Sequence, residues 1–387
     1  MPFWTFCAPN LIHNSPGSLF FFQICLYCSV LLTMDKQTII FISFCCFLFA
    51  GIICFLFTEG GARRTKLEGH SGSVKLFVFG DSYADTGNSN KSYAVSWKQP
   101  YGITFPRKPA GRFSDGRVLT DYLAWSLGIR SLVPYTRRGD VEKWEVQNGM
   151  NFAYGGTGVF NTLEKAPNMS TQISFFQQLL QQKWYTKQDL NSSIALLSLA
   201  GNDYGTFVVN HGNNPKDMSD FSKLVVNQLA DNIKQILSLG VRKIAVTTIH
   251  PLGCLPQITI YSSWNSCNHD WNLLSNFHNQ QLWQRMQSLN NTLQTDQKKN
   301  VIVVLDLYTA FQSAFAKQKN ITGNPLKPCC VGISNGYGCG SVDQSGAKKY
   351  SVCKNRELSF FWDMIHPSQK GWHAVYSELQ PSLYKLF

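Results

Sequence analysis

The chain has 387 residues, of which 44% are hydrophobic and 15% are charged. This composition can bury a large core, and it excludes an intrinsically disordered protein. Lys and Arg outnumber Asp and Glu by 35 to 23, which gives a formal net charge of +12. The basic residues are scattered in ones and twos without a zinc-finger, RRM or basic-helix motif, so we expect no nucleic-acid partner. A solvated basic surface is the simplest interpretation, and attraction to an anionic cell-wall matrix is the alternative.

The N-terminal part of the chain differs from the rest. An almost unbroken apolar run covers residues 38–57, with Lys36 before it and a charged stretch after it. This pattern predicts a signal peptide over residues 34–60, an upstream extension over 1–33 and a short N-terminal segment over 61–74. We therefore expect a secreted, extracellular or cell-wall protein. A signal-anchored membrane form is the alternative, because about 20 apolar residues can span a bilayer.

The cysteines and sequons of the body also agree with export. An even number of cysteines in an exported chain predicts disulfides, with a local loop between Cys254 and Cys267 and the other four pairing among themselves. A zinc site is the competing interpretation, but the adjacent Cys329 and Cys330 lack the paired Cys-x-x-Cys knuckles of a structural site, and we expect no metal. The six candidates are Cys254, Cys267, Cys329, Cys330, Cys339 and Cys353. The candidate glycosylation sites are Asn168, Asn191, Asn290 and Asn320.

From residue 75 onward, short apolar runs alternate with amphipathic stretches, which is typical of a parallel sheet covered by helices. The predicted strands cover residues 76–79, 147–152, 194–199, 243–248 and 301–305. The clearest predicted helices cover 221–239, which a glycine terminates, and about 270–289. The sequence contains no low-complexity linker in this part, so residues 75–387 are predicted to form a single domain.

Three of the predicted strands end in polar turns that contain glycine. Ser82 closes the turn after the first strand, Gly156 closes the turn after the second, and Asn202 lies in the turn after the third. Ligands of an open α/β sheet bind beyond the carboxyl ends of its strands. We therefore expect the three turns to line one crevice.

Ser82 is the candidate nucleophile. A serine hydroxyl needs a positioned base, which a carboxylate in turn orients. Near the C-terminus, Asp363 and His366 are separated by two residues and are followed by Pro367, which biases the segment toward a fixed loop. We expect His366 to be the base and Asp363 its orienting partner. The aspartates next to the serine, Asp81 and Asp85, are expected to hold turns.

The serine does not lie in the nucleophile elbow of an α/β hydrolase. That elbow reads Gly-x-Ser-x-Gly, whereas this chain has Gly80-Asp-Ser-Tyr-Ala84. The elbow also normally lies in the middle of the chain, with the acid and the histidine on separate loops. Both differences disfavour that fold.

Four blocks in order resemble the plant GDSL esterase/lipase family of the SGNH hydrolase superfamily, over about residues 75–387. They are Phe79-Gly-Asp-Ser82 with the Asp-Thr-Gly-Asn that follows, Asn151-Phe-Ala-Tyr-Gly-Gly156, Gly201-Asn-Asp203 and Asp363-Met-Ile-His366-Pro367. The resemblance implies a three-layer α/β/α, flavodoxin-like fold with a central, mostly parallel sheet. It also implies a catalytic triad of Ser82, Asp363 and His366, and an oxyanion hole of the Ser82 N–H, the Gly156 N–H and the Asn202 amide. Tyr83 departs from the leucine of the family name, and we expect it to pack beneath the turn, with substrate contact as the alternative.

The resemblance further implies a secreted serine esterase or lipase that hydrolyses carboxylic esters through an acyl-enzyme. We expect a small or medium ester as substrate, no cofactor and no obligate protein partner. An acyltransferase that uses the same serine is one alternative. A noncatalytic relative that binds wall polysaccharide is the other.

Overall fold

The computed structural model describes residues 74–199, 201–293, 301–322 and 324–386. The predicted upstream extension and signal peptide lie outside the described residues, as does the segment 61–74 except for its last residue. Among the residues that are described, no helix is both long and apolar enough to cross a membrane.

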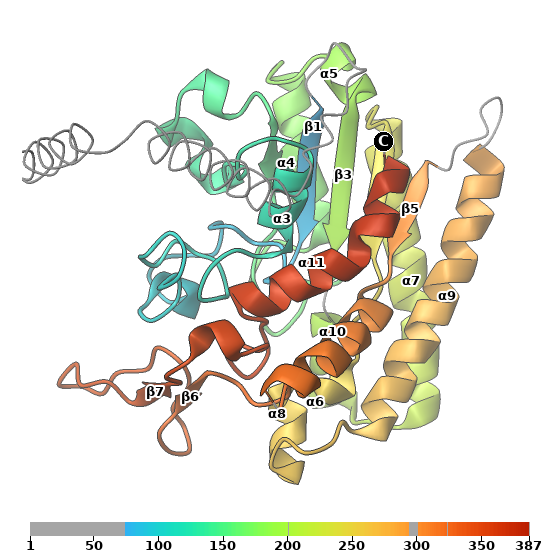
Figure 1. The fold of residues 1–387 in the computed structure, drawn as a ribbon. Helices are drawn as coiled ribbons and strands as arrows, with labels where there is room; N and C mark the ends of the chain where they lie inside the picture. The colour runs from blue at the N-terminus through green and yellow to red at the C-terminus, as the bar shows by residue number, and fades with distance from the viewer. Residues whose placement is uncertain (1–73, 200, 294–300, 323, 387) are drawn as a thin grey trace, which may run out of the picture. The chain divides into compact units, whose positions relative to one another are not determined.

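A five-stranded sheet lies at the centre of the described fold (Figure 1), with strand order β2-β1-β3-β4-β5. Every neighbouring pair is parallel. This is the flavodoxin-like order, and the strands are nearly continuous apolar runs because both faces are covered. The strands are β1 (Lys75–Gly80), β2 (Gly149–Asn151), β3 (Ser193–Ser198), β4 (Lys243–Thr247) and β5 (Ile302–Leu305). All five predicted strands are confirmed, with small differences at their ends.

Helices cover both faces of the sheet, which confirms the three-layer α/β/α architecture (Figure 1). One group of helices in mutual contact consists of α3 (Leu119–Ser126), α10 (Leu307–Thr322) and α11 (Gln369–Leu383). The other consists of α4 (Met169–Gln181), α7 (Pro215–Ser238) and α9 (His269–Leu293). Shorter helices are α5 (Lys187–Asn191), α6 (Asn202–His211) and α8 (Pro256–Thr259).

Both predicted helices exist, and each is longer than its apolar pattern. The helix predicted over 221–239 begins earlier, at Pro215, because the Asn214 side chain accepts hydrogen bonds from the N–H groups of Lys216 and Asp217. Proline at the first helical position and an asparagine cap are a favoured start. Gly240, with a φ of 105°, follows the end of the helix.

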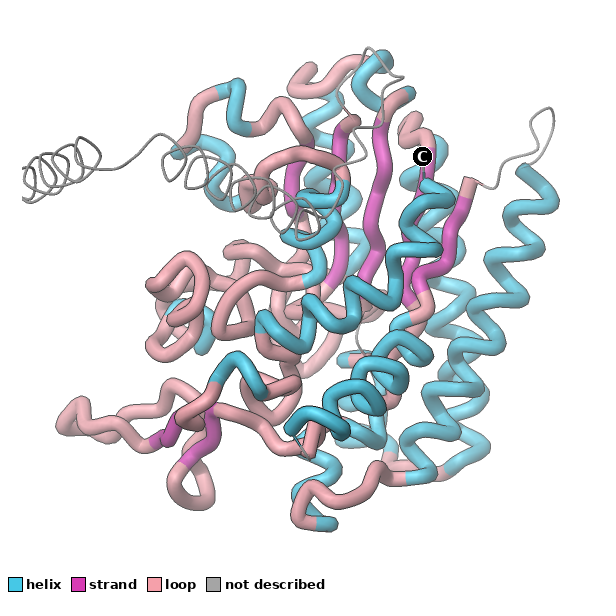
Figure 2. The backbone as a smooth tube through the Cα atoms, viewed as in Figure 1, coloured by secondary structure: helices cyan, strands magenta, loops and turns pink. Residues whose placement is uncertain are grey.

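Long loops lie beyond the carboxyl ends of the strands (Figure 2). One joins β1 to α3, and another precedes α11 and contains the antiparallel pair β6 (Cys330–Gly332) and β7 (Tyr350–Val352). The two loops meet in a small core of their own. Its buried members are Tyr101, Cys329, Cys330, Cys339 and Trp362.

The six cysteines of the described fold form three disulfides, as the sequence predicts. The pairs are Cys254–Cys267, Cys329–Cys353 and Cys330–Cys339. The first is the expected local loop. The other two lie within the four C-terminal cysteines and connect the segment around β6 and β7.

One of the four predicted glycosylation sites, Asn290, is buried in this fold. The side chain of Asn290 is 8% exposed, and its Nδ2 donates to the Ile302 carbonyl at 2.8 Å while its Oδ1 accepts from the Ile302 N–H at 2.9 Å. A glycan on Nδ2 would replace this pairing of α9 with β5. Asn191 and Asn320 are exposed and Asn168 is half-buried, and these three remain predictions.

Candidate active site

Ser82 lies in the tight turn that ends β1. Gly80 has a φ of 150°, and a Cβ at this position would lie 2.0 Å from the Ser198 carbonyl oxygen on the neighbouring strand. Glycine therefore lets β1 and β3 remain close up to their last residues. The Asp81 carboxylate then accepts the Tyr83 N–H at 3.0 Å, which closes the turn around the serine.

Two buried polar side chains fix this turn against its neighbours. Gln172 of α4 bonds both the N–H and the carbonyl of Gly80 at 2.9 Å, a clamp that the sequence did not reveal. Asp85 accepts the N–H of Gly87 and Asn88 at 2.7 Å and that of Gly155 at 3.1 Å. Burial raises the pKa of Asp85, and hydrogen bonds from Ser89, Gly87 and Asn88 oppose the rise. Asp81 and Asp85 therefore hold turns, as predicted.

Ser82, His366 and Asp363 come together as a hydrogen-bonded series. The Nε2 of His366 lies 2.9 Å from the Ser82 Oγ, although the two residues are 284 positions apart in the chain. The Nδ1 of the same ring lies 2.9 Å from each carboxylate oxygen of Asp363. All three side chains are buried, with exposed fractions of 7 to 8%. This arrangement allows a base to reach the serine proton while a carboxylate orients the base.

The Asp363 carboxylate is held by its own loop. Its Oδ1 accepts the N–H of Ile365 at 2.8 Å and of His366 at 2.7 Å. Burial alone would raise the pKa of Asp363, but the imidazole of His366 and hydrogen bonds, including one from Tyr101, leave the pKa below its ordinary value. The carboxyl group is therefore an ionised acceptor at neutral pH.

Two backbone N–H groups of the site have no hydrogen-bond acceptor among the described residues. The N–H of Gly155 is already used by Asp85 and by the Ser89 Oγ, at 3.1 and 2.9 Å. In contrast, no described residue accepts a hydrogen bond from the N–H of Ser82 or of Gly156. These are the two backbone donors that the sequence predicted for an oxyanion hole.

Asn202 connects the three strand-end turns. It begins α6, and its Nδ2 donates to the Asp81 carboxylate at 3.1 Å and to the Thr157 carbonyl at 3.0 Å. The turns after β1, β2 and β3 therefore meet, as expected from the topology. Both hydrogens of the amide are used in these bonds, so a substrate oxyanion would have to replace one of the two acceptors.

Two aromatic residues of the long β1–α3 loop complete the site, and the sequence analysis did not find them. The Tyr101 hydroxyl donates to the Asp363 Oδ2 at 2.7 Å. The Phe113 ring centroid lies 5.1 Å from that of His366, and the Phe113 Cζ would be 2.4 Å from a Cβ added to Gly155. The loop lacks the periodic pattern of a helix or strand, so no local signal marks these residues.

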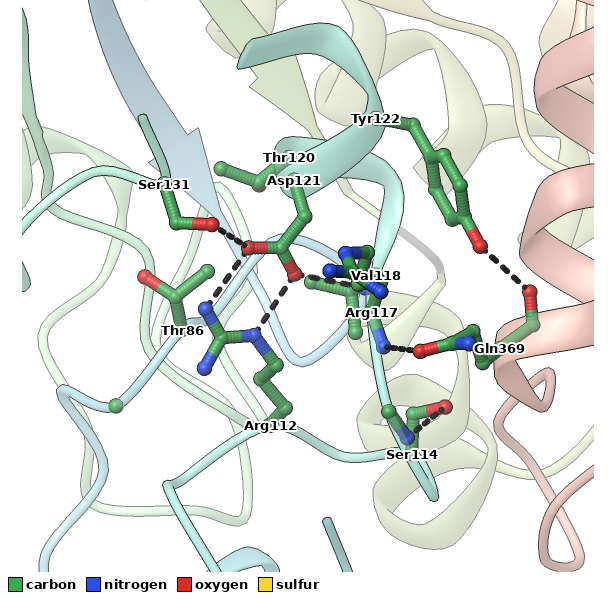
Figure 3. A network of polar contacts seen from close by, with 12 residues as sticks. Thr86, Arg112, Ser114, Arg117, Val118, Thr120, Asp121, Tyr122, Ser131 and Gln369 are labelled. Carbon is green, nitrogen blue, oxygen red and sulfur yellow. Dashed lines mark hydrogen bonds and ion pairs between the residues drawn. The ribbon is translucent and has the colours of Figure 1, made fainter. Parts of the chain in front are cut away.

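A buried ion pair anchors this loop (Figure 3). Arg112 donates from Nε and from a terminal nitrogen to the two carboxylate oxygens of Asp121 in α3, both at 2.8 Å. Burial alone would raise the pKa of Asp121, but Arg112 and further hydrogen bonds lower it. Gln369 of α11 accepts the Arg117 N–H at 3.0 Å through its side chain, and its carbonyl accepts the Tyr122 hydroxyl at 2.9 Å. The loop is thus fixed to both α3 and α11.

Comparison with known proteins identifies the family of this chain. Residues 76–379 match the family model described as GDSL-like Lipase/Acylhydrolase. GDSL esterase/lipase At5g03610 of Arabidopsis thaliana is 52% identical over 317 residues, which cover 80% of this chain and 87% of the relative. GDSL esterase/lipase At3g09930, of the same plant, is 50% identical over 317 residues, with coverages of 80% and 88%. Acetylajmalan esterase 2 of Rauvolfia serpentina is 28% identical over 356 residues, with coverages of 86% and 96%. The chain therefore belongs to the GDSL lipase/acylhydrolase family and is a hydrolase that acts on ester bonds.

Proposed function

We propose that the protein is a secreted serine esterase in which Ser82 is the nucleophile, His366 the general base and acid, and Asp363 the residue that orients His366. The observation that carries this assignment is the 2.9 Å contact between the Ser82 Oγ and the His366 Nε2. The ring has a second 2.9 Å contact, on its other nitrogen, with a buried carboxylate. A nucleophile, a base and an orienting group in hydrogen-bond reach define this class of site.

In the proposed mechanism the Ser82 Oγ attacks the ester carbonyl carbon while the His366 Nε2 takes the hydroxyl proton. Asp363 keeps the proton of the ring on Nδ1, which leaves the Nε2 lone pair free to act as base. The developing oxyanion accepts the N–H groups of Ser82 and Gly156. The Asn202 amide becomes a third donor when it gives up its hydrogen bond to either Asp81 or Thr157. Each donor of this kind contributes about 10²- to 10³-fold in rate.

The tetrahedral intermediate then collapses. His366 returns its proton to the departing alcohol, and the carbonyl bond to that alcohol breaks, which leaves the acyl group on the Ser82 Oγ. Water attacks this acyl-enzyme while His366 takes one of its protons. The carboxylic acid is released and the serine is regenerated. The steps use the chain's own side chains, and we propose no cofactor for them.

The substrate that we propose is a small or medium ester. The Phe113 ring lies between His366 and Gly155, so it borders the position of the reacting carbonyl. Export is supported by the predicted signal peptide and by the three disulfides, which are typical of oxidising compartments. The sequons at Asn168, Asn191 and Asn320 are proposed to be glycosylated.

The experiment is ester hydrolysis by the full chain produced in a secretory host, with 4-nitrophenyl acetate and butyrate as substrates. We expect Ser82→Ala to lower kcat by about 10⁴-fold or more, because removing the nucleophile of a triad abolishes its combined action. Ser174→Ala is the control, since that serine is exposed on α4 and bonds only its own helix, at the Ser170 carbonyl. Activity that Ser82→Ala leaves unchanged would contradict the assignment.

Two further measurements separate the alternatives. An aryl phosphonate should label the wild-type protein covalently at Ser82, and absence of labelling together with binding to wall polysaccharide would identify a noncatalytic relative. Product analysis with an added acceptor alcohol distinguishes hydrolysis from acyl transfer. We expect free acid as the main product, and an excess of transferred ester would identify an acyltransferase.

A further inference from the structure

We propose that two buried phenols, those of Tyr83 and Tyr101, position the Asp363–His366 pair by hydrogen bonds at its two ends. Both are positioning residues, since neither touches the reacting atoms. The inference rests on the proposed function of Ser82, Asp363 and His366.

The first phenol acts on the peptide that precedes the base. Tyr83 is 1% exposed, and its hydroxyl donates to the Ile365 carbonyl at 3.0 Å. That carbonyl belongs to the peptide unit whose N–H is on His366 and bonds Asp363 at 2.7 Å. One peptide plane is therefore fixed from both sides. Leucine, which the family name places at this position, could not supply the hydroxyl.

His250 adds a second hydrogen bond to this contact, on the other side of the Tyr83 hydroxyl. The Nε2 of His250 lies 3.2 Å from the Tyr83 hydroxyl oxygen. A carbonyl can only accept, so the single phenolic proton goes to Ile365, and the hydrogen of the second bond must come from His250. The structure therefore requires His250 to carry its proton on Nε2 and to donate to Tyr83. Consistently, the Nδ1 of His250 is buried, and no described residue bonds it.

The imidazole of His250 and the phenol of Tyr83 keep their protonation state over the pH range in which an esterase works. Burial, with a smaller effect of His366, lowers the pKa of His250 to about 3. Burial, with the charges of Asp81 and Asp363, raises the pKa of Tyr83 well above its ordinary value. The imidazole stays neutral and the phenol stays protonated. The series His250 to Tyr83 to Ile365 is therefore constant while the catalytic pair gains and loses protons.

Packing holds the Tyr83 ring in place. Its centroid lies 5.0 Å from that of Trp372 in α11 and 6.0 Å from that of His366, both with an edge-to-face orientation. On another side it stacks with Phe311 of α10 at 6.5 Å. Edge-to-face and offset contacts of this kind stabilise one ring orientation. The direction of the hydroxyl is thus set by the layer of helices behind the site.

The second phenol acts on the carboxylate itself. Tyr101 is 2% exposed, and its hydroxyl donates to the Asp363 Oδ2 at 2.7 Å. Burial, with the charge and hydrogen bond of Asp363, raises the pKa of Tyr101 well above its ordinary value, so it remains a donor. Without this hydroxyl, the buried Oδ2 would keep the imidazole as its remaining side-chain partner. The two backbone N–H bonds would then hold the carboxylate at Oδ1 alone.

The small disulfide-bonded core supports Tyr101. Its ring lies 6.1 Å from that of Trp362, the residue before Asp363. The carbonyl of Trp362 accepts the N–H of Cys330 at 2.7 Å, and Cys330 is bonded to Cys339. Tyr101 and the start of the catalytic loop are therefore attached to the same cross-linked segment. Small misplacements of a catalytic base matter, since about 1 Å can cost 10²-fold in rate.

The test compares Tyr83→Phe and Tyr101→Phe with Tyr185→Phe in the full chain. Tyr185 is a matched control, because it is 6% exposed and its hydroxyl donates to a backbone carbonyl, that of Val146, at 3.0 Å, at a position outside the site. We expect the two site variants to lose about 10- to 100-fold in kcat with KM changed less than about twofold. Tyr185→Phe should keep the wild-type kcat. Its unfolding temperature should fall by about as much as that of the two site variants. Equal kcat in all three variants would overturn the proposal.

Histidine-selective ¹⁵N NMR tests positioning without any assay of activity. The wild type should show His250 as the neutral Nε2–H form from about pH 5 to 8, and a downfield Nδ1 proton for His366. That proton signal should move in Tyr83→Phe and Tyr101→Phe and stay in Tyr185→Phe. An unmoved signal would overturn the positioning role even in an active esterase. If Ser82→Ala instead keeps activity, the proposed function fails, and the NMR result still decides the role of the phenols.

Discussion

At the scale of single residues, the site depends on backbone conformations that few side chains permit. Gly156 has a φ of 79°, and a Cβ at this position would lie 2.4 Å from the Cγ of Glu164. The left-handed conformation favours glycine, and the close approach of the Glu164 side chain leaves no room for a Cβ. The N–H that this conformation presents is one of the proposed donors to the oxyanion.

We therefore expect Gly156→Ala to lower kcat by about 10²-fold, because the altered turn displaces one oxyanion donor. The measurement is ester hydrolysis together with the unfolding temperature. Gly212→Ala is the control, since Gly212 has a φ of 81° at the end of α6 with nothing within 4 Å of the added Cβ. Equal kcat in the two variants would show that the Gly156 N–H has no part in the reaction.

At the scale of elements, one carboxylate joins the loop after β2 to α6. Asp203 accepts the N–H of Val159 at 3.0 Å and of Phe160 at 3.1 Å. A Cβ on Gly158 would lie 2.3 Å from its Oδ1, so glycine allows this close contact. The neighbouring Asn202 bonds the same loop at Thr157. Asp203 thus helps to bring the proposed oxyanion donors Gly156 and Asn202 together.

The titration of Asp203 gives a pH prediction. Burial raises its pKa to about 6, and the two N–H bonds oppose the rise. Between about pH 4 and 6 the folded protein keeps a proton that the unfolded chain has released, so this contribution to stability is lost as the pH rises through 6. We expect the unfolding free energy of the wild type, relative to Asp203→Asn, to fall by about 2 kcal/mol from pH 4 to 7.

Denaturant unfolding of both proteins at several pH values measures this difference. The other titrating groups are common to the two proteins and cancel in the subtraction. A difference that is constant, or that grows with rising pH, would contradict the assigned shift.

At the scale of the whole molecule, the +12 net charge is spread along the chain. Electrostatic attraction of this kind weakens with salt, because the screening length falls from about 10 Å at 0.1 M to about 3 Å at 1 M. We expect beads that carry polygalacturonate to retain the protein at low ionic strength and to release it in about 1 M NaCl. Unsubstituted beads are the control. Retention that salt does not change would exclude charge as its cause.

The sequence determined the elements and singled out the candidate catalytic side chains. Apolar runs and helical spacing are properties of neighbouring residues, so the five strands and the two clearest helices could be predicted from them. Asp363 and His366 share one short loop, and Ser82 follows the first strand directly. Their meeting in one site was therefore predictable from motifs in order, although they are distant in the chain.

The tertiary structure decided which distant groups meet. Tyr101 reaches Asp363 because a long loop without periodic pattern is fixed by the Arg112–Asp121 pair and by a disulfide-bonded segment. The packing of α9 against β5 buries the sequon at Asn290, which its local sequence could not distinguish from the exposed ones. Local pattern encodes backbone conformation, whereas a contact between loops depends on the packing of the complete chain. Only the folded protein could show how the acid–base pair is held.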